Sequence, residues 1–312
     1  MKIVSCFSAL RELEPLARAG ADEFYTAAEG LLPFSSGTLP PEHLPRAVKE
    51  AHRLGRRISI AVNTLLATAT VRQLAAIERR VLALDALGAD AFIFGNPYLL
   101  AKFSGRLKAQ LHLSSLQPVF NSLSAAFFAR FGVSRIILPN QLAPAEAARL
   151  LAFCRRRGIE TEIFDYRFFG CAYVNGRCQL HRPGHYTLRE EMSEGMLCRI
   201  NARPGGLVRA LRPDEPARAR ELPRLAARLE RRFTCGGAPR LSNAAAFFDF
   251  YSAGVQYLKY GIRQDAPEVK VRKVGELRRM IALAARLAAG RSRAAARRAF
   301  AAEMSGWNGG GF

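Results

Sequence analysis

The chain has 312 residues, 49% hydrophobic and 23% charged, which excludes a disordered chain, a collagen-like chain and a small disulfide-stapled scaffold. The formal net charge is +21, from 47 Lys and Arg against 26 Asp and Glu, but only seven of those cations are Lys. This skew toward Arg is typical of a composition bias spread along the chain. A surface that binds RNA or an acidic membrane is the alternative.

The hydropathy of the chain and its N-terminal run indicate in which compartment we expect the protein. No stretch of about 18 uncharged apolar residues occurs, so we expect no transmembrane segment. The opening run MKIVSCFSALRELEPLARAG meets charged residues too early for a signal peptide. We therefore expect a cytoplasmic protein, whose six cysteines are thiols, metal ligands or catalytic groups rather than disulfides.

A repeated pattern organises most of the chain: a helical pattern of apolar residues ends at a glycine, and a short β-rich run follows. It occurs at Gly20, Gly55, Gly88, Gly105, Gly132, Gly158 and Gly254. These runs are almost continuously apolar, as in a parallel sheet buried on both faces. Together with the opening run they predict eight strands, near residues 2–5, 22–26, 58–63, 91–95, 110–113, 135–138, 161–164 and 257–260.

Eight successive β-then-α units predict a (β/α)8 barrel, a TIM-like α/β fold. An open doubly wound sheet is the alternative, although no G-x-G-x-x-G follows the first strand. The spacing between Gly158 and Gly254 is 96 residues, which predicts an insertion after the seventh strand, over residues 165–240. Such an insertion begins at the carboxyl end of the strands, where barrel enzymes hold their active sites.

The chain after the eighth predicted strand continues as a helical pattern from about Glu268, which is broken at Gly290 and followed by the basic run RSRAAARR. We expect the barrel to span residues 1–290 and residues 291–312 to form a basic, solvated extension. An arm that contacts RNA or lipid is the alternative for this extension.

Four of the six cysteines fall in the expected insertion, at Cys171, Cys178, Cys198 and Cys235. Their spacing lacks the paired C-x(2–4)-C knuckles of most structural zinc sites, whereas a [4Fe–4S] cluster accepts scattered thiolates. From spacing alone, a cluster, a zinc site and unligated thiols all stay open. The other two, Cys6 and Cys154, are expected as small core residues, with a role for Cys6 at the barrel mouth as the alternative.

The segment CAYVNGRC, residues 171–178, resembles the C-x-x-x-x-G-R-C motif of peptidase family U32, the collagenase-like proteases. GADEFYTA, VNTLL, LHLSS and AGVQYLKYGIR occur in the order found in that family, and the resemblance covers about residues 1–275. It implies a barrel with a [4Fe–4S] cluster on Cys171, Cys178, Cys198 and Cys235.

The resemblance implies two kinds of activity: peptidase, as the family label says, or oxygen-independent hydroxylation. Similar proteins hydroxylate a ubiquinone precursor, tRNA or ribosomal RNA, with prephenate as the implied oxygen source. The length resembles the ubiquinone-type members, which implies a small aromatic or prenylated substrate and a sister subunit of the same family in a heterodimer. The alternatives are RNA base hydroxylation, a non-catalytic iron–sulfur subunit and a peptidase. For the last, the sequence has no HExxH and no G-x-S-x-G.

Three positions depart from the motifs of this family. The common K-I-E-G-R reads KYGIR at residues 259–263, a His four residues before the first motif cysteine is Arg167, and S-T-Q reads SSL at residues 114–116. We therefore expect the chemistry at the barrel mouth to differ from that of the members described above.

The remaining candidate site residues lie on or just after predicted strands. Lys259 and Arg263 would bind a dicarboxylate such as prephenate, because Arg binds a carboxylate through two parallel hydrogen bonds; ordinary ion pairing is the alternative. Tyr25 and Asn63 are candidate substrate-binding residues, with core packing and a helix cap as the alternatives. His112 and Arg263 are the candidate catalytic residues, and a core histidine is the alternative for His112.

Overall fold

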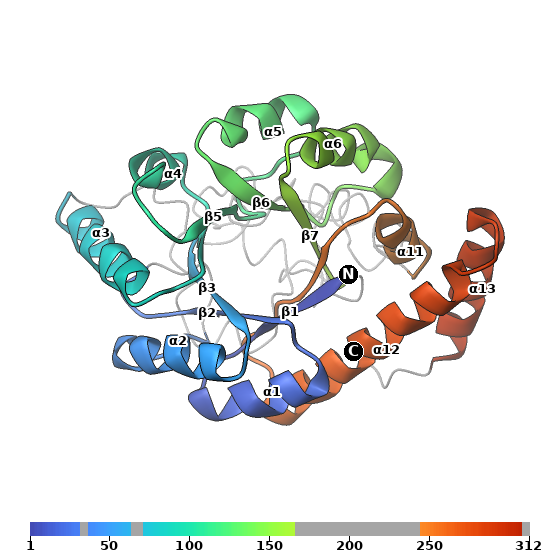
Figure 1. The fold of residues 1–312 in the computed structure, drawn as a ribbon, viewed down its shortest axis with the longest axis horizontal. Helices are drawn as coiled ribbons and strands as arrows, with labels where there is room; N and C mark the ends of the chain where they lie inside the picture. The colour runs from blue at the N-terminus through green and yellow to red at the C-terminus, as the bar shows by residue number, and fades with distance from the viewer. Residues whose placement is uncertain (32–36, 64–70, 166–243, 308–312) are drawn as a thin grey trace, which may run out of the picture.

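The computed structural model describes residues 1–31, 37–63, 71–165 and 244–307. Within them, eight parallel strands pair in sequence order and β8 pairs with β1, so the sheet closes into the predicted barrel (Figure 1). The strands are β1 (Lys2–Cys6), β2 (Glu23–Ala27), β3 (Arg57–Val62), β4 (Ala91–Phe94), β5 (Gln110–Leu113), β6 (Val133–Ile137), β7 (Glu160–Phe164) and β8 (Tyr257–Tyr260).

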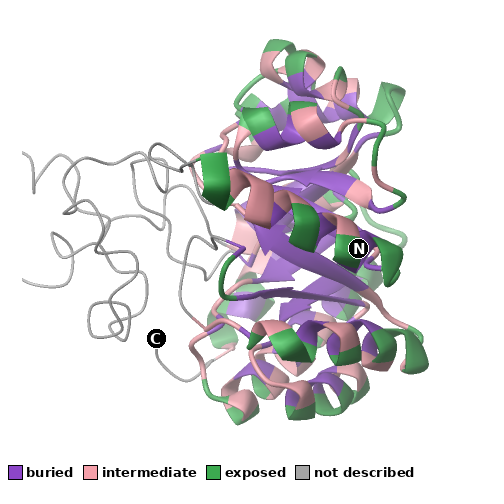
Figure 2. Cartoon of the chain, turned by 90° about the vertical axis from the view of Figure 1, so that its left-hand side faces the viewer, coloured by how far each residue is buried: buried purple, intermediate pink, exposed green. Residues whose placement is uncertain are grey.

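Helices surround the barrel on the outside (Figure 1). They are η1 (Leu10–Glu12), α1 (Leu13–Ala19), η2 (Pro41–His43), α2 (Leu44–Arg53), α3 (Val71–Ala86), α4 (Pro97–Phe103), α5 (Ser122–Ala129), α6 (Pro144–Arg156), α11 (Ala244–Ser252), α12 (Pro267–Ala288) and α13 (Arg293–Gly306). Their apolar faces pack on the strands, as with Ile77, Val81 and Leu84 of α3, which are buried at helical spacing. Figure 2 shows the buried strands enclosed by helices whose outer faces are exposed.

The predicted strands agree with the observed ones to within two residues at each end. The glycines that end the helical patterns have left-handed backbones, for example Gly158 at φ 66° and Gly254 at φ 83°. A residue with a Cβ would be strained in this conformation, so glycine is what lets each helix stop and turn into the next strand.

The side chains inside the barrel form layers of four that come from alternate strands, as the strand register dictates. Barrels of this kind are usually filled with branched apolar residues, but here the inward positions near the amino ends of the strands carry charge. From the amino end to the mouth, these layers are Lys2, Arg57, Gln110 and Glu160; Glu23, Ala91, Arg135 and Tyr257; Val4, Ser59, His112 and Glu162; and Tyr25, Ile93, Ile137 and Lys259.

The basic run after Gly290 forms helix α13, which packs against α11 and α12. Its residues Ala296, Phe300 and Met304 are buried, and the Phe300 ring centroid lies 5.4 Å from that of Phe248. Its arginines lie on the exposed side. The predicted break at Gly290 is therefore confirmed, whereas the described part of the expected solvated extension has a buried apolar face that covers α11.

The expected cysteine-rich insertion lies outside the described residues. The described chain leaves β7 at Asp165 and resumes at Ala244, where α11 begins. Among the described helices, none is both long and apolar enough to cross a bilayer.

Candidate functional site

Lys259 lies near the carboxyl end of β8, on the inner side of the barrel, and its side chain is only 4% exposed. Its Nζ lies 2.8 Å from Glu162 Oε1 and 3.8 Å from the centroid of the Tyr25 ring. The ammonium therefore has a carboxylate and an aromatic face as neighbours, and both attract a cation. The ion pairing given above as the alternative for Lys259 is present, with Glu162 as the partner.

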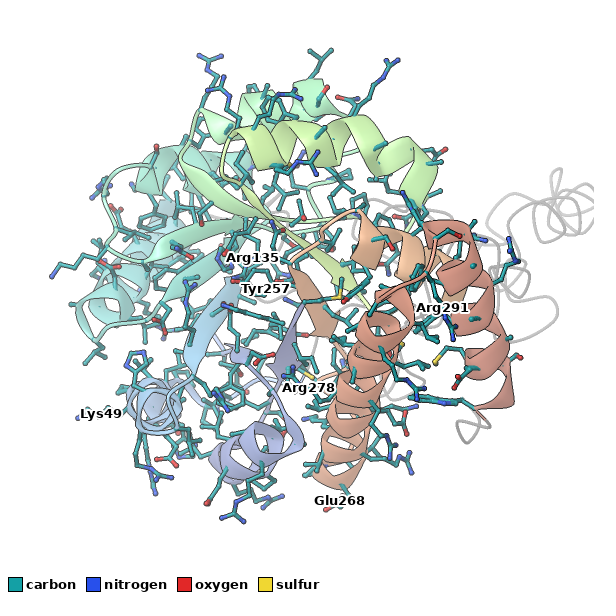
Figure 3. The ribbon with its side chains drawn as sticks, turned by 45° about the vertical axis from the view of Figure 1, so that its right-hand side comes forward. Lys49, Arg135, Tyr257, Glu268, Arg278 and Arg291 are labelled. Carbon is teal, nitrogen blue, oxygen red and sulfur yellow. The ribbon has the colours of Figure 1, made fainter. Side chains whose placement is uncertain are left out.

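The layers beneath Lys259 hold a charged network centred on Arg135, which is fully buried. Its guanidinium donates to both carboxylate oxygens of Glu23 at 3.0 Å, to Glu162 at 3.1 Å and to Glu160 at 2.9 Å. It also lies 3.4 Å over the Tyr257 ring, and Figure 3 shows the two labelled side chains together inside the barrel. With Lys259, the network contains two cations and three carboxylates.

Within this network, the pKa shifts of Glu162 and Arg135 both favour the charged form. Burial raises the pKa of Glu162, but the nearby cations Lys259 and Arg135 lower it by more than burial raises it. The pKa of Glu162 therefore lies below its ordinary value. Burial lowers the pKa of Arg135, but the carboxylates of Glu162 and Glu23 raise it above its ordinary value. Because Glu162 contacts both cations, the network fixes the position of Lys259 from below.

Tyr25 lies beside Lys259, and its hydroxyl donates to the Gly261 carbonyl at 2.8 Å. Burial and the neighbouring Cys6 raise the pKa of Tyr25 well above its ordinary value, so the side chain is a neutral hydrogen-bond donor. The guanidinium carbon of Arg263 lies 6.0 Å from the centroid of the same ring. Tyr25, Lys259 and Arg263 thus form one group at the mouth of the barrel.

Arg263 follows β8 and is 4% exposed. Ser8 Oγ lies 3.4 Å from its carbonyl oxygen, and Lys270 Nζ lies 2.8 Å from both Ser8 Oγ and Glu12 Oε2. Gly37, at φ 72°, packs so closely that a Cβ there would lie 2.8 Å from the Cβ of Arg263. Contacts from the β1–α1 segment and from Gly37 therefore position the Arg263 backbone.

His112 is fully buried on β5, two layers below the strand ends. Its Nε2 lies 3.4 Å from Gln110 Oε1, an oxygen that also accepts from Arg57, while its Nδ1 has no hydrogen-bond partner among the described residues. Burial and the cations Arg135, Lys259 and Arg57 lower the pKa of His112 well below its ordinary value. The ring is therefore neutral at physiological pH and is no general acid there, although Nδ1 keeps a lone pair.

Asn63 follows β3, and its Nδ2 lies 3.4 Å from Ser114 Oγ, just beyond β5. Gly95, at the end of the intervening strand β4, packs against the Asn63 backbone, where a Cβ would lie 2.3 Å from the Asn63 carbonyl oxygen. Asn63 and Ser114 thus form a second polar group at the mouth, on strands other than those of Tyr25 and Lys259. Ser114 belongs to the SSL segment that departs from the family motif.

The two described cysteines, Cys6 and Cys154, are buried and unbridged. Burial raises the pKa of Cys6 to about 12 and that of Cys154 to about 11, so both are protonated thiols, as expected for core residues. No group of three or more metal-binding side chains occurs among the described residues. The four predicted cluster ligands, Cys171, Cys178, Cys198 and Cys235, lie outside the described residues.

Arg135, Glu23 and Glu162 are absent from the predicted site, yet they determine where Lys259 lies. Each is a charged residue within a strand run: EFYTA, VSRII and ETEIF. A charge on the inward side of a buried strand requires a partner, because an unpaired charge away from water is costly. That rule is the signal that could have singled them out.

The family model for peptidase family U32 matches residues 8–187, more than half of the chain. The chain belongs to this family. A curated relative, the tRNA hydroxylation protein P2 of Bacillus subtilis (strain 168), is 27% identical over 132 residues, and the match spans 42% of each chain.

Two solved structures illustrate the similarity in three dimensions. A U32 peptidase of known structure has a TM-score of 0.45 at 14% identity, over 53% of this chain and 68% of that one. Dihydrodipicolinate synthase from Thermotoga maritima has a TM-score of 0.41 at 12% identity, over 90% of this chain and 98% of that one.

Proposed function

We propose that this U32-family protein takes part in an oxygen-independent hydroxylation of a small aromatic or prenylated substrate. Membership of the family and similarity to a protein named for tRNA hydroxylation support hydroxylation as the kind of reaction. The choice of a small substrate rests on one observation: Tyr25, Lys259 and Arg263 are each 4% exposed. A group that reaches them must leave water almost completely, as small ligands do in their pockets.

The three mouth residues have different roles in this proposal. Arg263 binds a carboxylate of a small anionic oxygen donor such as prephenate, through the paired hydrogen bonds that a guanidinium offers. Lys259 adds positive potential at the floor of the site, while Glu162 at 2.8 Å holds it in place. Tyr25, neutral and bonded to the Gly261 carbonyl, offers its ring as a neighbour to both cations.

His112 acts in this proposal as an acceptor rather than as an acid. Its depressed pKa keeps the ring neutral, and Nδ1 has no partner among the described residues. A donor group of a bound molecule, or a water that it carries in, would satisfy this nitrogen. Asn63, beside Ser114, would orient a hydroxyl or carbonyl of the substrate.

We also propose that Cys171, Cys178, Cys198 and Cys235 hold a [4Fe–4S] cluster. The described cysteines are protonated core thiols, which leaves these four as the candidate thiolate ligands. The segment that contains them follows Asp165, the last described residue before it, and the Asp165 backbone N–H donates to the Lys259 carbonyl at 2.9 Å. When bound, such a cluster would supply one-electron redox chemistry.

A sister subunit of the same family is the proposed partner, and a non-catalytic iron–sulfur subunit in such a pair is an alternative to an enzyme that acts alone. The peptidase alternative has less support. At neutral pH Cys6 is a neutral buried thiol and His112, two layers below the strand ends, is a neutral imidazole, so the described residues hold no thiolate–imidazolium pair.

Hydroxylation of an RNA base is the second candidate function. Two observations favour it: the relative named for tRNA hydroxylation and the net charge of +21. On this alternative the base would be turned out of its strand to reach the buried mouth, as enzymes that modify nucleobases require.

The test measures two sets of molecules, quinone precursors and RNA nucleosides, in anaerobic cells that lack their own U32 hydroxylases. Cells that produce the wild-type chain, with its sister subunit where one is encoded, are compared with cells that produce Arg263→Ala. Mass spectrometry then measures quinone precursors and RNA nucleosides. The proposal predicts an oxygen-bearing quinone precursor only with the wild-type chain. A hydroxylated nucleoside instead would establish the RNA alternative, and a change in neither set would contradict both.

A further inference from the structure

Helix α5 differs from every other described α-helix in that it carries no charged side chain. Residues 109–129 contain no Asp, Glu, Lys or Arg, in a chain that is 23% charged. The outer faces of helices in a soluble barrel are normally covered with charged residues, so an uncharged outer helix needs a reason.

Three large apolar side chains on and just before α5 are exposed: Leu123 at 81%, Phe127 at 48% and Phe120 at 38%. Leu123 and Phe127 are four residues apart and share one face of α5, and Phe120 immediately precedes the N-cap Asn121; we call these three residues the α5 stripe. Ala125 and Phe128 lie on the opposite, buried side of the helix. The stripe accounts for three of the six exposed large hydrophobic residues in the described part of the chain.

A group of arginines borders one end of the stripe. Arg130 ends α5, and Arg155, Arg156 and Arg157 end the adjacent helix α6. Both helices run antiparallel to the strands, so these ends meet at the amino end of the barrel. All four arginines are exposed and have no carboxylate partner among the described residues, whereas Lys102 and Arg106, near the end of α4, share Glu78. We call these four residues the arginine edge.

We propose that the α5 stripe and the arginine edge together form a docking surface for an anionic lipid bilayer. Phe120, Leu123 and Phe127 enter the boundary between headgroups and acyl chains, and the arginine edge contacts the lipid phosphates. Apolar side chains on one helix line beside clustered arginines are the combination by which peripheral proteins bind such surfaces. This inference does not depend on which substrate is hydroxylated.

Three other occupants fit the observations less well. RNA would stack on aromatic faces, but the most exposed residue of the stripe is Leu123, which has none. A second copy would bring together two chains that each carry a net charge of +21, and these charges repel each other. A rigid protein partner would need an apolar surface shaped to these three side chains and acidic groups opposite the arginine edge, whereas an anionic lipid interface offers both and deforms around the side chains.

The test is flotation of the full chain with vesicles of equal parts phosphatidylglycerol and phosphatidylcholine, compared with vesicles of phosphatidylcholine alone. The variants are Leu123→Ser/Phe127→Ser and Arg155→Glu/Arg156→Glu. The matched control is Arg291→Glu/Arg298→Glu, which makes the same charge change at two exposed arginines, one just before α13 and one within it. Helix α13 lies on another side of the barrel from α5 (Figure 1), and Figure 3 labels Arg291. Thermal unfolding of each variant shows whether it is folded.

The proposal predicts that the wild type binds the anionic vesicles and that each of the two test variants binds at least about tenfold more weakly. The control variant binds like the wild type, and binding weakens between about 0.1 and about 0.5 M salt. If the control variant lost as much vesicle binding as the test variants, net charge alone would explain the binding, and the proposal would be overturned. It would also be overturned by binding that is insensitive to the stripe variant, by displacement of the vesicles by a single-stranded RNA oligonucleotide, or by a dimer that only the stripe variant dissociates.

Discussion

Arg135 provides the sharpest test of the charged barrel interior. Arg135→Met removes a guanidinium that donates to three carboxylates, of which Glu23 and Glu162 are almost fully buried. Glu162 keeps Lys259 as a partner, but among the described residues Glu23 keeps only the Ser59 hydroxyl, at 2.7 Å. Removal of one partner from a buried ion pair typically costs about 3–5 kcal/mol, because the remaining charge is desolvated and uncompensated. We expect a loss of that size in the free energy of unfolding.

Urea titration at neutral pH measures this loss, and two further variants separate its causes. The double variant Arg135→Met/Glu23→Gln also removes the carboxylate charge that Arg135→Met leaves uncompensated. Its free energy of unfolding is expected to lie within about 2 kcal/mol of the wild-type value. Arg53→Met removes an arginine whose partner Glu50 lies on the surface, and it is expected to change stability little. A loss below about 1 kcal/mol for Arg135→Met, or no recovery in the double variant, would refute the argument that the interior network is a desolvated ion-pair cluster.

Three further predictions concern the mouth and the cysteines. The anaerobically purified chain is expected to hold about four irons and four sulfides, which Cys178→Ser loses; zinc in their place would contradict the cluster. Tyr25→Phe leaves the Gly261 carbonyl without its donor and is expected to lower the free energy of unfolding by about 1–3 kcal/mol; an unchanged urea midpoint would contradict the bond. Because the pKa of Glu162 is lowered in the folded state, its contribution to stability is present above the ordinary value of 4.5 and is lost as pH falls below it. Stability should therefore decrease in acid less steeply for Glu162→Gln than for the wild type, and parallel curves would contradict this.

Much of the barrel can be predicted from local patterns, because each βα unit has its own signals. The run ETEIF after Gly158 illustrates this: the glycine ends a helix, and the β-branched residues that follow form β7. Eight such units leave few topologies, since parallel strands with right-handed crossovers close in sequence order.

The network inside the barrel depends on information that no local pattern contains. Glu23 and Arg135 are 112 residues apart, and Glu162 and Lys259 are 97 apart. Only the stagger between strands decides which inward side chains share a layer, and that stagger follows from closure of the whole sheet. The prediction that Lys259 lies at the mouth could therefore be made from its strand, but its pairing with Glu162 could not.

Helix α13 shows how composition can mask a pattern. Ala296, Phe300 and Met304 recur every four residues, the spacing of a buried helix face, but the surrounding arginines favoured a solvated extension. In the structure both features hold, because the apolar line packs on α11 while Arg297 pairs with Asp249 at 2.8 Å.

The proposed mouth site is tested most directly by titration calorimetry of prephenate into the anaerobically purified chain. The account predicts one binding site for each chain and at least about tenfold weaker binding by Arg263→Ala, because a guanidinium–carboxylate pair is lost from a buried site. Iron content should be equal in the two proteins, so that a damaged cluster does not account for the loss. Undiminished binding by Arg263→Ala, or no binding by the wild type, would contradict the role assigned to the barrel mouth.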